Sequence, residues 1–408
     1  MHGIIKNKGF HYGYVIVFCC VLIMAINVGL VTSCAGIFYK PVSEELGVTV
    51  GNLGLYMSFN FLFSALTLFV AGRMIERFSI RLLLSVSSLV MGGCLISMAF
   101  FNSVWQFYVV AGGVIGITLS FLLYLSFPVL INRWFNVRVG FFIGICSAAA
   151  SIGGILFNPL GAYWITEYGW RITYGIFGTI VLLVVTPVIW FLLRDYPEDK
   201  GLQPYGADLT GKEVQPKEGI EYAKAIRMPE FYGLILFAFM MILVSTLHLL
   251  IPVYVTKLDF SLEVAGFVAA GVMAGGTLGK IALGIINDRN NKLGILTSSG
   301  LGVVGFFLLL NGHFAGLWSV VAGGFLFGWA YAGTTVQTMM LVRTVFGSKN
   351  YAQIYSKVSI ALPCGGILAA AEGLLADKIG YASVFGLAIV LLLLSACIGF
   401  FVLRKKFY

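Results

Sequence analysis

Charge is scarce throughout this sequence. Of its 408 residues, only 11% are Asp, Glu, Lys or Arg, whereas 59% are hydrophobic. A soluble domain carries roughly a quarter charged residues, so this composition excludes a soluble protein held by a single anchor. The formal net charge of +9 would suit nucleic acid, but the basic residues lie in short loops rather than in one patch, and no nucleic-acid partner is expected.

Clustered reactive side chains are lacking as well. The seven cysteines all lie in apolar segments, form no CxxC pair and gather with none of the four histidines. Neither a disulfide framework nor a metal site is therefore expected. No nucleophile–base motif or phosphate-binding loop stands out, so we predict a protein that is not an enzyme and uses no cofactor.

The sequence has instead twelve apolar runs of about 20 residues, the length that crosses a bilayer as a helix. They fall at residues 14–38, 52–72, 82–101, 105–131, 140–163, 172–193, 231–256, 263–286, 293–311, 316–342, 352–375 and 381–403. They predict an all-α polytopic membrane protein with two pseudo-symmetric six-helix bundles. We expect an N-terminal bundle at 1–193, a polar linker at 194–230 and a C-terminal bundle at 231–408.

The basic residues predict how the chain is oriented. Of the 26 Lys and Arg residues, only Lys40, Arg171, Lys257 and Lys378 fall on the side opposite the termini, and Lys280 and Lys357 lie inside spans. Cytoplasmic loops are enriched in Lys and Arg, so both termini and the linker are predicted to be cytoplasmic. The first run is too long for a signal peptide and eleven more follow, so we expect a retained span in a cell membrane, of the bacterial inner-membrane kind.

An internal repeat relates the two halves. The pentapeptide VVAGG at 109–113 recurs at 320–324, GGIL at 153–156 recurs at 365–368, and the spaced Gly, acid and Arg of 72–77 recur at 284–289. These matches keep the same order and an offset near 212 residues. Two homologous halves of six spans place a substrate site near the midplane, between the halves.

Residues 72–81, GRMIERFSIR, resemble the signature of the major facilitator superfamily in the loop between spans 2 and 3, with Glu76 for the usual Asp and Ser79 for a Gly. The resemblance covers the whole chain and implies that superfamily's fold. In the family this acid–base element latches the helices at the cytoplasmic face. It thereby implies a conformational role for Gly72, Glu76, Arg77, Arg81, Gly284, Asp288 and Arg289. The alternative is that these charges only follow the excess of basic residues in cytoplasmic loops.

Further segments are similar to the monocarboxylate transporters and their oxalate/formate antiporter relatives. These are WFNVR at 134–138, GIFYK at 36–40 and GLQPYG at 201–206. In that group an arginine of span 8, four residues before a glycine, binds the substrate carboxylate, and Lys280 stands four residues before Gly284. The resemblance implies that Lys280 binds an anion, with a point charge in place of a bidentate fork. Gly276 replaces the Asp of the proton-coupled members, which argues against proton symport by their route.

The position of Lys280 in its helix favours anion binding independently of the resemblance. Its helical face carries Gly276, Thr277 and Gly284, whereas Leu278 and the isoleucines occupy the opposite face. The lysine lies roughly 12 Å from Asp288 along the helix axis, beyond full recovery by snorkelling. No acid lies in the middle of any span, so a mobile anion is the natural partner. A structural, snorkelling lysine is the alternative.

Other candidate substrate contacts are less specific. Lys357 in span 11 would provide a second cation, as in the oxalate carriers, or would snorkel to the nearby interface. His248 could donate to a carboxylate or carry a proton, or be a buried histidine satisfied by a backbone carbonyl. The resemblance extends to Tyr254 and Tyr331, because tyrosines of spans 7 and 10 contact substrate in the carboxylate carriers. Ser359, Cys364 and Asn27 complete the candidate contacts.

These observations favour a secondary active transporter for a small carboxylate, a monocarboxylate or short dicarboxylate, working by alternating access. We expect it to be a monomer in the lipid bilayer. Antiport against a counter-anion, proton symport and uniport all remain open. One alternative is a facilitator for a neutral solute or drug, with Lys280 structural. Another class is a non-transporting receptor or scaffold, for which an appended soluble domain or long tail would be expected.

Overall fold

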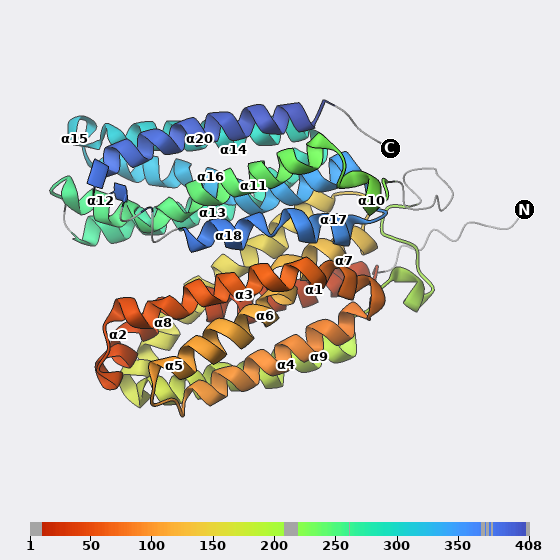
Figure 1. Ribbon diagram of the computed structural model, residues 1–408, viewed down its shortest axis with the longest axis horizontal. Coiled ribbons are helices and arrows are strands. Elements are labelled where there is room, and N and C mark those ends of the chain that lie inside the picture. The colour runs from red at the N-terminus through yellow and green to blue at the C-terminus, as the bar shows by residue number, and fades with distance from the viewer. Residues whose placement is uncertain are drawn as a thin grey trace, which may run out of the picture.

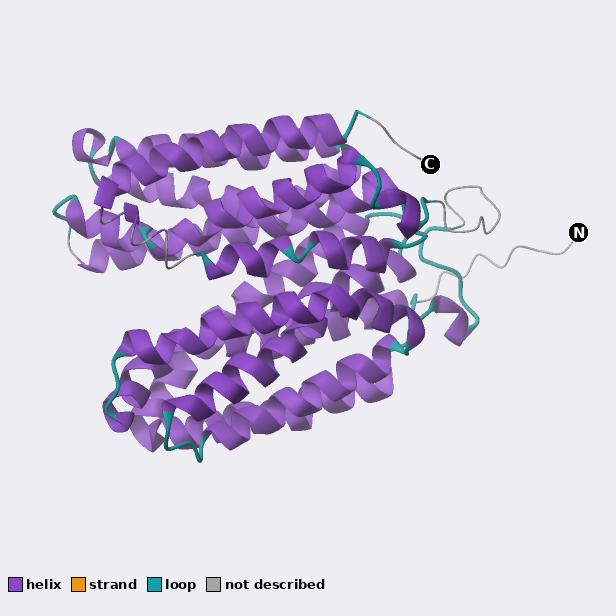
Figure 2. Cartoon of the chain, viewed as in Figure 1, coloured by secondary structure: helices purple, strands orange, loops and turns teal. Residues whose placement is uncertain are grey.

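The computed structural model describes residues 10–207, 219–260, 262–368, 372, 375–376 and 378–404. Within these ranges the chain is helical, and its only extended pairings are isolated bridges. The helices form two bundles that lie side by side with their axes roughly parallel (Figures 1 and 2). The start of α1 (Gly13–Leu22) and the end of α20 (Tyr381–Val402) lie at the same end of the molecule (Figure 1).

The first bundle contains the helices up to α9. Besides α1 these are η1 (Ile23–Ser33), α2 (Ala35–Leu46), α3 (Val50–Arg77), α4 (Ile80–Met98), α5 (Val104–Gln106), η2 (Phe107–Val114), α6 (Ile115–Leu119), η3 (Ser120–Leu125), α7 (Ser126–Trp134), α8 (Val139–Ile180), η4 (Val181–Val185) and α9 (Thr186–Leu192). The long α8 contains two spans, because Gly169 at φ +80° turns the chain between them. Only glycine adopts that conformation without strain.

The second bundle contains the helices from α11 onward. They are α11 (Pro229–Thr246), η7 (Leu247–Leu249), α12 (Ile251–Lys257), α13 (Leu262–Arg289), α14 (Asn291–Leu310), α15 (Gly312–Ala315), α16 (Leu317–Phe346), α17 (Tyr351–Val358), α18 (Ala361–Ile367) and α20. The break between α17 and α18 has a covalent cause: Pro363 has no N–H to bond the Ser359 carbonyl.

The expected membrane-spanning architecture is confirmed. In the described residues ten helical segments are long and apolar enough to cross a membrane. The tenth expected span is the 30-residue α16. The eleventh begins with α17 and α18, and parts of it after residue 368 lie outside the described residues.

The linker between the bundles attaches to the first of them. Tyr205 pairs with the end of α7 through its N–H to the Trp134 carbonyl, 2.8 Å. The Asp195 carboxylate accepts from the N–H groups of Ile80 (2.8 Å) and Arg81 (3.0 Å), and so caps α4. The short η5 (Pro197–Lys200) follows. On the second bundle, Ile220 donates to the Phe346 carbonyl, and α10 (Tyr222–Ala225) leads into α11.

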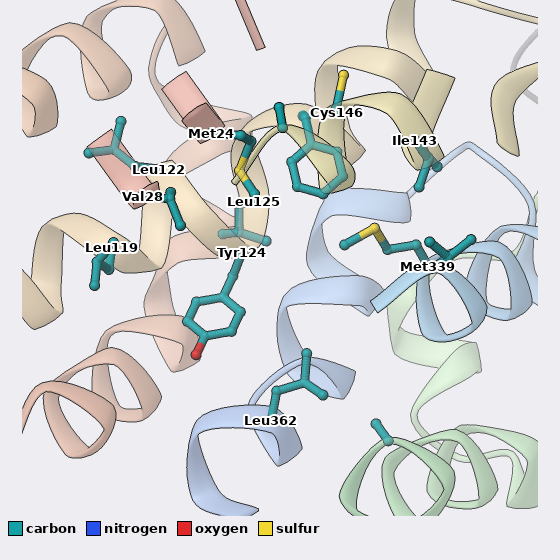
Figure 3. Packing of buried hydrophobic residues seen from close by; sticks show 14 of the residues in the cluster. Met24, Val28, Leu119, Leu122, Tyr124, Leu125, Ile143, Cys146, Met339 and Leu362 are labelled. Atoms are coloured by element: carbon teal, nitrogen blue, oxygen red, sulfur yellow. The ribbon is translucent and has the colours of Figure 1, made fainter. Parts of the chain in front are cut away.

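The two bundles meet closely at the end that holds α10 and the linker. On one side α8 packs against α13, where a side chain at Gly140 or Gly144 would collide with the carbonyls of Gly284 and Lys280. On the other side α3 packs against α17, where a side chain at Gly72 would collide with Ser356. Small residues at such crossings let helix backbones approach directly. One buried apolar cluster continues through this junction, with Tyr124 and Leu125 on the first bundle and Met339 and Leu362 on the second (Figure 3).

Farther along the same helices the bundles separate. On α8 the positions facing α13 continue one turn beyond Ser151 to Ile155, which is 62% exposed. The two bundles also diverge toward the end that holds α2 and α12 (Figure 1). A closed end and a splayed end are the geometry expected of one state of an alternating-access protein.

Candidate functional site

Lys280 lies where the two bundles begin to separate. Its side chain is only 5% exposed. Its Nζ donates to Ser151 Oγ at 3.1 Å and to the Ser147 carbonyl at 3.4 Å, both on α8 of the other bundle. An ammonium has three donor directions, so two of them end on the opposite half of the molecule.

The third neighbour of the ammonium is an aromatic face. Lys280 Nζ lies 5.3 Å from the centre of the Tyr331 ring of α16, within the range of a cation–π interaction. The ring of His248 meets Tyr331 edge-on at 5.3 Å between centroids. The structure therefore brings together Lys280, Tyr331 and His248, three of the residues singled out from the sequence.

His248 sits in η7, where span 7 changes from α11 to α12. Its Nδ1 lies 2.8 Å from the Ser245 carbonyl. A carbonyl can only accept, so Nδ1 carries the proton and a neutral ring presents Nε2 as an acceptor. This bond is the satisfied arrangement considered from the sequence, and the second ring nitrogen has no hydrogen-bond partner among the described residues.

Two other predicted contacts face elsewhere in the structure. The ring of Tyr254 in α12 packs against Tyr381 and Phe385 of α20, with centroids 6.4 and 4.9 Å away. Asn27 in η1 is fully buried and donates to Ser88 Oγ of α4 at 3.0 Å. Each therefore contacts helices of its own bundle rather than Lys280.

The candidates of span 11 lie on the other inter-bundle contact. Lys357 donates to the Phe69 carbonyl of α3 and lies 5.0 Å from the Phe69 ring. It lines a small pocket with Arg73. Ser359 is buried and donates to the Ser356 carbonyl at 3.2 Å, whereas Cys364 in α18 is half-buried. Lys357 thus faces span 2 and not the Lys280 ammonium.

The acids of the two signature elements each contact a helix of the opposite bundle. Asp288 accepts from the N–H groups of Gly140 (2.7 Å) and Phe141 (2.9 Å) and thereby caps α8. Glu76 accepts from the Gln353 amide in the first turn of α17. Phe141 and Gln353 differ by the repeat offset near 212 residues, so the two acids occupy equivalent positions. A carboxylate at a helix N-terminus is favoured by the unpaired N–H groups and the helix dipole there.

The remaining signature residues have different surroundings. Gly72 and Gly284 are contact points between bundles. Arg81 lies with its Cζ 5.0 Å from the centre of the Trp190 ring, inside the first bundle. Arg77 and Arg289 are exposed at the ends of α3 and α13. The glycines and the acids therefore make the cross-bundle contacts, and these three arginines do not make them in the described part of the chain.

Several polar residues of this region are not predicted from the sequence. Ser147 and Ser151 ligate Lys280, and Ser147 Oγ also shares a 3.1 Å hydrogen bond with Thr335 of α16. The spacing of Gly144, Ser147 and Ser151 places them on one helical face, and this shared face can be read from the sequence. Nothing in the spacing shows that this face meets span 8.

A charged cluster also lies at the splayed end, where Glu45 stands between the first two spans. The Glu45 carboxylate pairs with Arg171 at 2.9 Å and accepts from the Trp170 indole N–H. The hydrogen bond from Arg171 lowers the pKa of Glu45, slight burial opposes this, and the Trp170 bond adds to the lowering. Arg171 also donates to the Ala99 carbonyl (2.8 Å) and the Asn102 side chain (3.0 Å), so it joins α2, α4 and α8.

Comparison with known proteins places this architecture in a family. The family model described as Major Facilitator Superfamily matches residues 18–311 and 257–407. Among solved structures, the proton:xylose symporter XylE has a TM-score of 0.77 at 13% identity and covers 96% of each chain. A likeness at that identity speaks for the fold alone.

Three relatives of known sequence are similar over different lengths. The MFS-type transporter YcxA of Bacillus subtilis is 23% identical over 160 residues, and the match spans 39% of its length. The mouse glucose-6-phosphate exchanger SLC37A2 is 24% identical over 76% of this chain and 70% of its own. Monocarboxylate transporter 4 of Rattus norvegicus is 24% identical over 44% of this chain and 37% of its own.

Proposed function

The chain belongs to the major facilitator superfamily, and on that premise we propose that it transports a small organic carboxylate across a membrane by alternating access, with Lys280 as the cation that binds the anion. One observation carries this proposal. Lys280 is 5% exposed, and its ammonium faces a hydroxyl, a carbonyl and an aromatic ring, with no carboxylate in ion-pair range in the described residues. A buried charge without a counter-charge is expensive, and a bound carboxylate would supply the counter-charge.

The same electrostatics gives a mechanism. An anion that enters from the splayed end meets the ammonium at the point where the bundles converge, and neutralises it there. Closing the site around a neutral ion pair costs less than closing it around a lone ammonium. Reorientation of the loaded carrier is therefore favoured over that of the empty carrier, which favours exchange of one anion for another.

The placement of Lys357 supports a monoanion as the substrate. A dianion would be best held by two cations, but Lys357 donates to the Phe69 carbonyl beside Arg73. Lys280 is then the single buried cation of the site described here. The likeness to monocarboxylate transporter 4 over 44% of the chain agrees with this choice.

The proposal also names the residue that would couple transport to a proton. His248, with Nε2 available and its ring against Tyr331, is the residue that would carry a proton if transport is symport.

The excess of Lys and Arg at the end that holds the linker favours a cytoplasmic location for that end and for both termini. The bacterial relative YcxA suits a bacterial inner membrane. We expect the monomer to be the working unit.

A sugar phosphate is a second candidate, favoured by the likeness to the glucose-6-phosphate exchanger over 76% of the chain. Lysine is a good phosphate ligand as a point charge. A phosphate monoester carries close to two negative charges at pH 7, however, and one buried ammonium neutralises only one of them. The carboxylate is therefore the better match to this site.

An uptake panel in proteoliposomes tests the proposal. Liposomes holding the wild-type protein are loaded in turn with acetate, lactate, formate, oxalate, glucose-6-phosphate and xylose, and uptake of the labelled external solute is followed. We expect uptake of a monocarboxylate that is stimulated by the same anion inside. Uptake of xylose but of no anion would bring forward a neutral-solute facilitator, and no uptake of any solute would favour a receptor.

A further inference from the structure

Ser151 is the residue of the first bundle that meets the Lys280 ammonium at the edge of the splayed region. Gly144 lies directly against the Lys280 backbone, so α8 and α13 are in close contact there. Ser151 lies two helical turns farther along α8, and the bundles have separated by Ile155, one turn beyond it. A solute that reaches Lys280 from the splayed end therefore arrives beside the Ser151 hydroxyl.

The hydroxyl of Ser151 has a proton to give. Ser151 Oγ accepts the hydrogen bond from Lys280 at 3.1 Å, and among the described residues no acceptor is bonded to its own proton. Serines inside helices commonly donate to the carbonyl four residues earlier, and Ser151 does not. The hydroxyl of Ser147 differs, because it is bonded to Thr335 Oγ1 at 3.1 Å, and Thr335 donates to the Ala332 carbonyl at 3.3 Å.

From this geometry we infer that Ser151 is a substrate-binding residue, which donates its hydroxyl proton to the carboxylate that Lys280 attracts. The inference rests on the proposed function. A hydroxyl polarised by an ammonium is a stronger donor than a free one, and ammonium and hydroxyl lie close enough to bind one carboxylate group together. The anion would then be held by one ligand from each bundle, so its binding ties the two halves to each other.

The alternative role for Ser151 is purely structural, as one of several polar contacts between bundles. The chain supplies a control for that role in Thr335. The Ser147–Thr335 bond also crosses between the bundles and lies one turn away from Ser151, but Thr335 has no hydrogen bond to Lys280. Replacement by the isosteric valine removes this bond and leaves the ammonium and Ser151 in place.

The test compares Ser151→Ala, Ser151→Thr and Thr335→Val in proteoliposomes, with KM and maximal rate measured for labelled lactate and acetate. We expect Ser151→Ala to raise KM about tenfold, as for loss of one hydrogen bond to a charged group, with the maximal rate within about twofold. Ser151→Thr, which keeps the hydroxyl, should restore KM to within about twofold, and Thr335→Val should leave KM at the wild-type value. Thermal unfolding of each purified variant reports whether it folds.

Two results would overturn the assignment. One is an unchanged KM in Ser151→Ala, and the other is an equal rise of KM in Thr335→Val, which would indicate a general loosening of the interface. Failure of the proposed function is a different result. Wild-type liposomes would then take up neither lactate nor acetate, or Lys280→Gln liposomes would take them up equally well.

Discussion

Lys280 and Leu68 occupy equivalent positions in the two halves, since the repeat offset near 212 residues relates them. Leu68 is fully buried, and Lys280 is almost so. An apolar side chain thus satisfies the packing of this position in the first half. The charge in the second half is not required by packing, and its cost of burial points to a function.

At the residue scale, Lys357 provides a test of the monoanion proposal. Its ammonium is bonded to the Phe69 carbonyl on the α3 side of the interface. We therefore expect Lys357→Gln to keep the KM for lactate within about twofold, while stability falls by about 1 kcal/mol for the lost hydrogen bond. A tenfold rise of KM, or the same loss of uptake as in Lys280→Gln, would place Lys357 in the substrate site.

The Glu45–Arg171 pair predicts a pH dependence of stability. Because Arg171 lowers the pKa of Glu45 in the folded protein, the unfolded chain takes up this proton at a higher pH than the folded one. The stabilisation is fully present above the unfolded pKa and is lost as pH falls through the folded pKa. Both side chains are partly exposed, so it amounts to less than about 1 kcal/mol.

We expect Glu45→Gln to lower the unfolding temperature at neutral pH. The difference from wild type should shrink as the pH falls below the usual carboxylate range. The exposed Glu167 on α8 offers a control, since Glu167→Gln should change little at any pH. A gap between wild type and Glu45→Gln that grows toward acid would contradict the assignment.

At the scale of elements, α8 is capped by an acid of the other bundle. Asp288 accepts from two N–H groups of its first turn, so capping of α8 and contact between the bundles are the same interaction. Within the first bundle, Asp195 caps α4 in the same way. Its loss has no direct effect on the contact between the bundles.

These two caps form a matched pair for mutation. Asp288→Ala and Asp195→Ala should each cost about 0.5–2 kcal/mol of stability, the usual range for a lost N-cap. Only Asp288→Ala should also increase the distance between spin labels on α8 and α13 near the closed end, measured by pulsed electron paramagnetic resonance. An equal increase in both variants, or in neither, would argue against a latch at Asp288.

At the scale of the whole molecule, the sequence predicts much of the fold because a helix that crosses lipid must be apolar over about 20 residues. Apolar runs of about 20 residues and the repeats near residues 72 and 284 suffice for twelve spans in two related halves. The cost of a buried ammonium marks Lys280 in the same way. Rotation of each helix about its axis is not encoded so simply. Asn27 and Tyr254 therefore face their own bundles, and Ser151, a small residue in a Gly- and Ala-rich helix, goes unnoticed although it contacts Lys280.

The central claim is that the transported anion supplies the counter-charge of the Lys280 ammonium. It is tested most directly by the exchange of labelled lactate in proteoliposomes that hold wild type, Lys280→Arg or Lys280→Gln. We predict that Lys280→Gln lowers kcat/KM about 100-fold, as for roughly 3 kcal/mol on breaking a buried ion pair, and that Lys280→Arg keeps part of the activity. Lactate exchange by Lys280→Gln at the wild-type rate, from protein that unfolds at the wild-type temperature, would contradict the claim.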